Sequence, residues 1–391
     1  MAFLAWIFWQ TQHSTPSVET KDKGRPVRLT NAESARLARP RSPSRQTNAV
    51  GLTVSTSKPP VIPSANRATN VIRVSSNAPA VGGNMPFLSV YTNALTSNAA
   101  SVTPQPGVKA QSVFDAQVAL YRAGIAPGSI DGALGSQTRA ALEVFQKAHG
   151  LPVTGALDET TRRRLTLSEP AVTNYVVTTA DLGRLRPLSK TWLGKSRQDR
   201  LDYETILELA AEKGRAHPRE IRLLNPGVDW DHVYAGQVLK IPASDYPVPT
   251  DKAAFLRIYL SRRALEAYDS ETNVMAHFPV SIARRVEKRP VGQLHVQTVA
   301  SDPNYVFNPD IFPESAEAKT LGRKLVLPPG PNNPVGAVWI GLDRNGYGIH
   351  GTPSPEEVGR TESHGCFRLS NWNAEYLVKL VWVGMPVWVE P

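Results

Sequence analysis

The chain has a single cysteine, Cys366, which follows His364 by two positions in the stretch SHGCFR. A thiol becomes a strong nucleophile once a neighbouring base or cation favours the thiolate. Two histidines are candidates for that base: His364, and His350 sixteen residues upstream. Alternate residues of an extended segment point to opposite sides, so His364 is poorly directed at the sulfur. We therefore expect Cys366 to be a nucleophile and His350 its base.

The neighbours of the thiol suit acyl chemistry. Gly365 has no side chain, so a substrate carbonyl can approach the backbone, and adjacent N–H groups can form an oxyanion hole. Arg368 supplies a fixed cation whose planar fork matches a carboxylate. These residue types predict attack of the thiol on a carbonyl carbon.

Other interpretations of the same residues stay open at this point. An isolated cysteine is commonly a small buried hydrophobic residue. His350, His364 and Cys366 could ligate zinc, although a His-x-Cys spacing matches no common structural zinc site. His364 could also be a hydrogen-bonded loop histidine. With one cysteine in the chain, an internal disulfide and a multi-cysteine zinc framework are both excluded.

The elements around these residues are predicted to be mainly β. The runs FLRIYL, RRALEAYD, HFPVSIAR, QLHVQTVA, AVWIGL and PVWVEP each read as a strand. Asn345-Gly346 predicts a hairpin that places His350 at the end of a strand. Asn371 is a candidate cap for the helix that follows. Cys366 is therefore expected on a short loop between strands and a helix, where catalytic residues often lie.

The stretch IHGTPSPEEVGRTESHGCFR resembles the signature of L,D-transpeptidases, which runs His-Gly-Thr, Gly and Ser-His-Gly-Cys-x-Arg. The matching residues are His350, Gly351, Thr352, Gly359, Ser363, His364, Gly365, Cys366 and Arg368. PVSIAR, RPVG and PPGPNNPVG look like further segments of this family, and the resemblance covers roughly 252–391. Ala283 and Arg289 depart from the usual glycine and threonine.

The resemblance implies a mechanism. Cys366 would attack the carbonyl between an L- and a D-residue of a peptidoglycan stem, forming a thioester and releasing D-alanine. His350 would take the thiol proton, and no metal or organic cofactor would be needed. The other family positions would orient the base or shape the oxyanion wall (Gly351, His364, Gly365), or bind substrate (Thr352, Ser363, Arg368).

Residues 111–168 are expected to form three short helices joined by glycine-containing turns. The turns IDG and VTGALD, with Gly-x-x-Thr, Ala-Leu and Phe-Gln between them, resemble peptidoglycan-binding domains of three helices. This resemblance implies that the segment binds glycan. Each of these positions also makes sense as a turn or core residue.

Residues 172–245 form a second expected module, small and α/β. It begins with the strand-like VTNYVV, contains a helix in YETILELAAEKGR, and ends in Leu-Asn followed by GQVLKIP. The ending is similar to that of lysin-motif domains, but the first helical region is longer than that motif usually has. A glycan binder and a structural spacer remain equal alternatives.

Residues 1–110 are rich in Ser, Pro, Asn and basic residues, and are expected to be a disordered linker. Up to residue 108 the segment has eleven Lys and Arg against three acids, so it carries +8 of the net +10. The basicity thus belongs to a tail, and a nucleic-acid-binding surface is poorly supported. The apolar run from Ala2 to Trp9 is too short to span a bilayer. We interpret it as a signal remnant, with a true signal, an anchor or a misplaced start as alternatives.

The sequence therefore predicts a multidomain α+β protein with a mainly β, sandwich-like catalytic domain over 252–391. Its expected function is exported, cysteine-dependent L,D-transpeptidation in the periplasm or cell envelope, with peptidoglycan stem peptides and glycan as partners. Hydrolysis of the same bonds by a carboxypeptidase or endopeptidase is one alternative. A non-catalytic wall-binding scaffold is the other. The acceptor of the acyl group and the oligomeric state cannot be deduced from the sequence.

Overall fold

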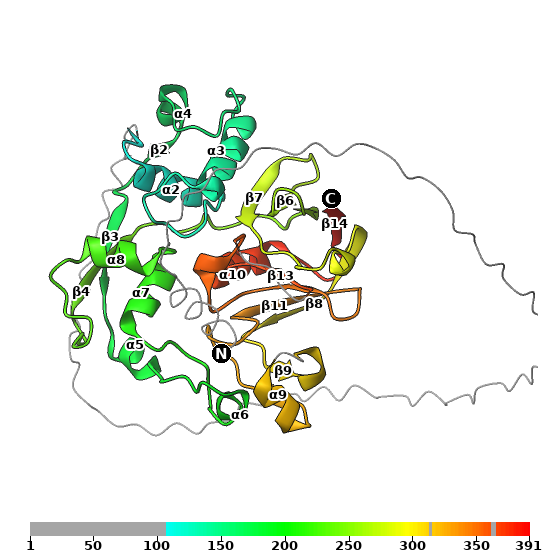
Figure 1. Cartoon of the computed structure of the whole chain (residues 1–391). Coiled ribbons are helices and arrows are strands. Elements are labelled where there is room, and N and C mark those ends of the chain that lie inside the picture. The colour runs from blue at the N-terminus through cyan, green and yellow to red at the C-terminus, as the bar shows by residue number, and fades with distance from the viewer. Residues whose placement is uncertain (1–106, 313–314, 361–364) are drawn as a thin grey trace, which may run out of the picture. The chain divides into compact units, whose positions relative to one another are not determined.

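The structure is a computed structural model that describes residues 107–312, 315–360 and 365–391 (Figure 1). The expected linker over 1–110 falls almost wholly outside the described residues, as do Ser363 and His364. No helix in these described ranges has the length and apolar character needed to cross a membrane.

The first described part contains the three expected helices. They are α2 (Val113–Arg122), α3 (Ser136–Ala148) and α4 (Glu159–Arg164). A short antiparallel pair, β1 (Val108–Lys109) with β2 (Thr166–Leu167), joins the two ends of this part. Ser112 and Asp115 form a reciprocal capping box at the start of α2, which satisfies N–H groups that a helix leaves unpaired.

Two buried glutamines hold the turns on which the resemblance rests. The Gln117 side chain accepts the N–H of Gly132 at 2.9 Å and donates to the Asp131 carboxylate at 2.9 Å. Gln146 accepts the N–H of Gly155 at 2.9 Å and donates to the Ala156 carbonyl at 3.0 Å. Each turn therefore has its backbone groups satisfied by one amide from the core.

The second part is built on one antiparallel strand pair, β3 (Val172–Val176) with β4 (Val238–Pro242). Its helices are α5 (Thr179–Arg184), α6 (Trp192–Lys195), α7 (Ile206–Lys213) and α8 (Pro218–Leu224). The Asn225 side chain donates to the carbonyls of Ile221 and Lys240 and accepts the Lys240 N–H, each at 2.8 Å. The Leu-Asn position of the sequence pattern thus joins the end of α8 to β4.

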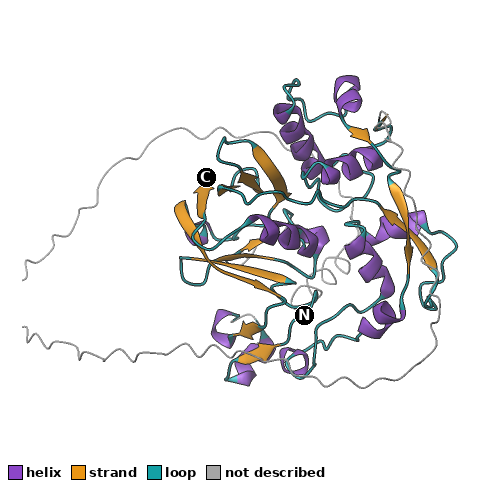
Figure 2. Cartoon of the chain, turned by 180° about the vertical axis from the view of Figure 1, so that it is seen from behind, coloured by secondary structure: helices purple, strands orange, loops and turns teal. Residues whose placement is uncertain are grey.

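The third part is mainly β, as expected. Eight strands are hydrogen-bonded in one series, in the order β13-β12-β11-β8-β14-β5-β6-β7. Their bounds are β5 (Phe255–Tyr259), β6 (Ala264–Tyr268), β7 (Val274–Pro279), β8 (Gly292–Ser301), β11 (Val338–Leu342), β12 (Gly348–His350), β13 (Phe367–Arg368) and β14 (Pro386–Glu390). Helix α10 (Asn371–Leu380) packs on β11 and β12, as Figure 2 shows from behind. Five of the six expected strands are present over their runs. The sixth run, HFPVSIAR, overlaps β7 only over 277–279, because β7 ends at Pro279 and Ser281 forms only an isolated bridge to Arg368.

A small subdomain interrupts this sheet between β8 and β11. The antiparallel pair β9 (Tyr305–Phe307) and β10 (Leu325–Leu327) flanks α9 (Ala316–Leu321). Trp192 of α6 stacks on Phe307 at 4.3 Å between ring centroids. The Glu317 carboxylate accepts the N–H groups of Trp192 and Leu193 at 2.8 and 2.9 Å. The second part is therefore packed against the β9–β10 subdomain.

Glu212 of α7 lies against α10 and is predicted to make stability depend on pH. Burial raises its pKa to about 8, the Glu375 carboxylate adds to this shift, and a hydrogen bond from Asn371 opposes it. The folded protein then binds a proton that the unfolded chain releases near pH 4.5, so stability falls as pH rises from about 4.5 to 8. We expect Glu212→Gln to flatten this fall.

Urea unfolding of the parent and of Glu212→Gln at pH 5, 7 and 9 would measure the effect. Glu169→Gln serves as the control, because Glu169 is an exposed glutamate outside the α7–α10 contact. Equal pH dependence in the parent and in Glu212→Gln would contradict the prediction.

Candidate active site

The pairing of β12 with β13 brings the candidate base and nucleophile to one face of the sheet. The two strands are parallel, with Ile349 opposite Phe367 and His350 opposite Arg368. Paired residues point to the same face, and so do residues two apart along a strand. Cys366 directly precedes β13 and is two residues from Arg368, so its side chain shares the face of His350.

His350 is set up as a neutral base. Its side chain is 6% exposed and its ring stacks on Trp339, with 5.6 Å between ring centroids. Nδ1 lies 2.6 Å from the Gly351 carbonyl oxygen. Since a carbonyl only accepts, Nδ1 carries the hydrogen and Nε2 of the neutral ring keeps its lone pair. Burial lowers the pKa of His350 to about 4; the Gly351 hydrogen bond opposes this shift and Arg368 adds to it.

The thiol of Cys366 is held in its protonated form. Burial raises its pKa, while a backbone hydrogen bond from Gly348 and the charge of Arg368 pull the pKa down. The half-buried sulfur lies 3.5 Å from the carbonyl oxygen of Gly346. A neutral thiol beside a neutral imidazole transfers its proton during attack, in contrast to a preformed ion pair.

Close packing leaves no room for a side chain at Gly351. A Cβ on this residue would lie 2.2 Å from Oδ1 of Asn371. That oxygen accepts the N–H of Ala337 at 3.1 Å, and Nδ2 of Asn371 donates to the Pro331 carbonyl at 3.1 Å. Asn371 thereby joins the PPGPNNPVG segment to the residue whose carbonyl orients His350. The helix cap expected at Asn371 is wrong by one position, because Ser370 is the N-cap and Asn371 is the first helical residue.

Two parts of the chain match models of known domain families. Residues 253–389 match the family model of the L,D-transpeptidase catalytic domain. Residues 109–165 match the model of a peptidoglycan binding domain. The chain thus carries a transpeptidase domain that follows a peptidoglycan-binding domain.

Individual relatives cover different shares of the chain. A Bacillus licheniformis protein that carries the name L,D-transpeptidase YkuD is 27% identical over 189 residues, which are 48% of this chain and 94% of that protein. YbiS of Escherichia coli, also named as an L,D-transpeptidase, is 32% identical over 166 residues, 42% of this chain and 53% of that protein. This chain therefore spans about half the length of YbiS. A solved L,D-transpeptidase from Xylanimonas cellulosilytica has a TM-score of 0.31 at 16% identity, covering 73% of this chain and 96% of that chain.

Three other predicted site residues, Thr352, Gly365 and Arg368, lie within two positions of His350 or Cys366 in the chain. Thr352 is buried, and its hydroxyl accepts the N–H of Ser354 at 3.3 Å in the turn after the base. Arg368 is partly buried, and this burial lowers its pKa while the Glu357 carboxylate raises it. Gly365 directly precedes the thiol. Ser363 and His364 lie outside the described residues, so their expected roles and a zinc set that includes His364 stay predictions.

Sequence reasoning missed two residues of this site. Burial raises the pKa of Tyr305 of β9 to about 12, and the charge that Cys366 would carry as a thiolate adds to the shift, so the phenol lies within electrostatic range of the sulfur. Trp339 covers the His350 ring from β11. The sequence gives no signal for Tyr305, because it belongs to the β9–β10 subdomain and is far from Cys366 along the chain. Trp339 could have been found, since a hairpin at Asn345-Gly346 pairs AVWIGL with the strand of His350.

Gly351→Ala is predicted to disturb the orientation of the His350 ring. The added methyl group would overlap Oδ1 of Asn371, so we expect a loss of about 1–3 kcal/mol in unfolding free energy and slower acylation. Thermal unfolding and the rate of thioester formation would measure the two effects. Gly183→Ala is the matched control, since no atom lies within 4 Å of its Cβ position. Unchanged stability and acylation in Gly351→Ala would contradict the packing argument.

Proposed function

We propose that this chain is an exported enzyme that crosslinks or edits peptidoglycan by L,D-transpeptidation, acting in the periplasm or cell envelope. The observation that carries the proposal is the neutral, buried His350, whose Nδ1 is tied to the Gly351 carbonyl on the sheet face shared with Cys366. This arrangement suits a base that takes a thiol proton and later returns it.

Acylation would proceed by transfer of the thiol proton to Nε2 of His350 as the sulfur of Cys366 attacks the carbonyl carbon of the L-residue. The resulting oxyanion would be stabilised by backbone N–H groups at Gly365 and Cys366, with Ser363 and His364 shaping that wall. Collapse breaks the C–N bond, and the departing D-alanine amine takes the proton from His350. A thioester and a neutral base remain.

Deacylation would run the same steps towards an acceptor amine. The amine attacks the thioester carbon, His350 takes its proton, and the C–S bond breaks as the proton returns to the sulfur. Arg368 and Thr352 are the candidate substrate contacts in the described part of the site. The positive charge of Arg368 also opposes protonation of His350, so it keeps the base available.

The other parts of the chain would bring the enzyme to its polymer. We propose 111–168 as the peptidoglycan-binding unit, 172–245 as the lysin-motif-like unit and 252–391 as the catalytic unit, with 1–110 as a tether. The second unit serves either as a glycan binder or as a spacer. Its packing against the β9–β10 subdomain through Trp192 and Glu317 supports the spacer role.

Mass spectrometry tests the proposal and distinguishes transfer from hydrolysis. The full chain is incubated with a synthetic stem tetrapeptide, with and without an acceptor amine. We expect D-alanine release, an acylated protein mass, and an amide product once the amine is present. A tripeptide acid as the product even with the amine would assign a hydrolase. Absence of both D-alanine release and acylation would reject the proposed chemistry.

A further inference from the structure

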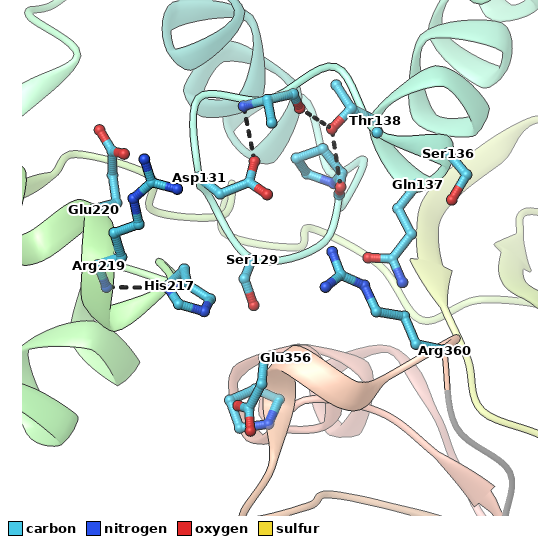
Figure 3. Close-up of a pocket in the computed structure, with 14 residues that line it drawn as sticks. Ser129, Asp131, Ser136, Gln137, Thr138, His217, Arg219, Glu220, Glu356 and Arg360 are labelled. Carbon is cyan, nitrogen blue, oxygen red and sulfur yellow. Dashed lines mark hydrogen bonds between the residues drawn. The ribbon is translucent and has the colours of Figure 1, made fainter. Parts of the chain in front are cut away.

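A cavity of about 190 Å³ lies where the three parts of the described chain meet (Figure 3). We call it the junction pocket. One wall is the IDG turn with the start of α3, the second is the start of α8, and the third is the segment 355–360 of the transpeptidase domain. Its polar lining includes Ser129, Asp131, Gln137, His217, Arg219, Glu220, Glu356 and Arg360.

The first two walls are joined through their backbones. The N–H of Ile130 donates to the Arg215 carbonyl at 2.9 Å, and the N–H of His217 donates to the Ile130 carbonyl at 2.9 Å. Ile130 and Ala216 form a parallel β-bridge between the IDG turn and the segment before α8. These bonds are independent of any ligand, so the cavity is formed in advance of binding.

The third wall is fixed by Gln137 of α3. Its Nε2 donates to the Val358 carbonyl at 2.5 Å. A Cβ on Gly359 would lie 2.6 Å from that nitrogen, and a Cβ on Gly128 would lie 2.0 Å from Oε1. Both glycines also have positive φ angles, +74° and +87°, which other residues rarely adopt. Gln137 therefore fits between two glycines and connects the peptidoglycan-binding domain to the loop that leads towards Cys366.

The same loop is held from the opposite side by the catalytic sheet. The Gly359 N–H donates to the Ser281 hydroxyl at 2.9 Å, and Arg263 donates to the Gly359 carbonyl at 2.9 Å. The segment that supplies Glu356 and Arg360 to the cavity is thus anchored on both of its sides. A ligand in the junction pocket would rest on the loop that leads to the nucleophile.

The lining carries charges of both signs. Arg219 and Arg360 provide two guanidinium groups, and no salt bridge to either is present among the residues that the structure describes. Asp131, Glu220 and Glu356 provide carboxylates. A Cβ on Gly132 would lie 3.9 Å from Oε2 of Glu220, so this carboxylate lies beside the IDG turn that carries Asp131. Burial raises the pKa of Glu220, the charge of Asp131 adds to this shift, and the charges of Arg219 and His217 oppose it.

We propose that the junction pocket binds the end of a short peptide with both carboxylates and an amine, the chemistry of a peptidoglycan stem, as a second site distinct from the catalytic cleft. Two guanidinium groups suit the carboxylates, and Asp131 with Glu220 suits the amine. No Phe, Tyr or Trp lies among the described residues that line the cavity, so these residues offer no aromatic surface on which a sugar would stack. The identity of the ligand rests on the proposed function.

Binding stoichiometry tests this proposal. Full chain carrying Cys366→Ala, which cannot be acylated, is dialysed against a labelled stem tetrapeptide. We expect two equivalents bound per chain. Arg219→Ala or, separately, Arg360→Ala is then added to this parent. Each change removes a charge-assisted hydrogen bond to the ligand, so the second equivalent is expected to bind more weakly by about tenfold or more. Arg164→Ala, on the exposed face of α4, is the matched control and retains both equivalents.

Different outcomes test ligand binding in the junction pocket and the proposed reaction. One bound equivalent in the Cys366→Ala parent, or a second equivalent that both arginine variants retain in full, would overturn the junction pocket. A second equivalent that a neutral N-acetylated sugar oligomer displaces and the stem peptide does not would also overturn it. Circular dichroism confirms that each variant is folded. If wild-type chain is never acylated while the Arg219-dependent equivalent persists, the proposed reaction fails and the pocket stands.

Discussion

Replacing Cys366 with alanine is expected to abolish acylation and lower D-alanine release by about 10⁴-fold or more. The reason is that Cys366 carries the only thiol of the chain and shares the sheet face of His350. Intact-mass spectrometry after incubation with a stem tetrapeptide would measure the acyl-enzyme, and amino-acid analysis would measure D-alanine.

The substitution should leave the fold intact, because the half-buried Cys366 side chain is small and alanine keeps the backbone unchanged. Cys366→Ser provides a second comparison, since a hydroxyl keeps the polarity but is a weaker nucleophile at neutral pH. D-alanine release at the wild-type rate from a folded Cys366→Ala protein would show that Cys366 is not the nucleophile.

Replacing His350 with alanine is expected to slow acylation by about 10²–10⁴-fold, the range typical of a lost general base. The thiol keeps its raised pKa without an acceptor for its proton, so the deficit should shrink as the pH rises and the thiolate forms unaided. Stopped-flow acylation of the parent and of His350→Ala between pH 5 and 10 would measure this. Equal rates at pH 7 would contradict the role of His350.

The pH profile of the parent follows from the same geometry. Burial lowers the pKa of His350 to about 4, so the imidazole is neutral above that pH and protonated below it. We expect kcat/KM to rise through an apparent pKa of about 4 and to stay level through neutrality. A rise centred at pH 6 to 7 would show that the base is more exposed than His350 is in this structure.

The same shift predicts acid sensitivity of the fold. Unfolded His350 takes up a proton near pH 6.5, whereas the folded protein resists protonation down to about pH 4. The unfolded state therefore binds more protons between these values, and stability is lost as the pH falls from about 6.5 to 4. The contribution of His350 to stability thus falls towards low pH, whereas that of Glu212, whose pKa is raised, falls towards high pH.

Local patterns in the sequence determined much of this protein. Apolar runs separated by turn signals predicted β5, β6, β7, β8, β11 and β14, because side-chain alternation is a property of the strand itself. Glycine-containing turns predicted the ends of α2 and α3, and the run YETILELAAEKGR predicted α7. The Cys366 motif with His350 gave the chemistry, since its residue types and spacing lie within one stretch of chain.

Only the tertiary structure decided which distant residues complete the site. Tyr305 lies within electrostatic range of Cys366 although it belongs to an inserted subdomain, and Gln137 donates to the Val358 carbonyl from another domain. Asn371 looked like a helix cap, yet its side chain joins Pro331 and Ala337 beside Gly351. Such contacts leave no periodic signal, because they depend on how separate elements pack together. The sequence thus predicted the nucleophile and its base, and tertiary packing decided which distant side chains lie around them.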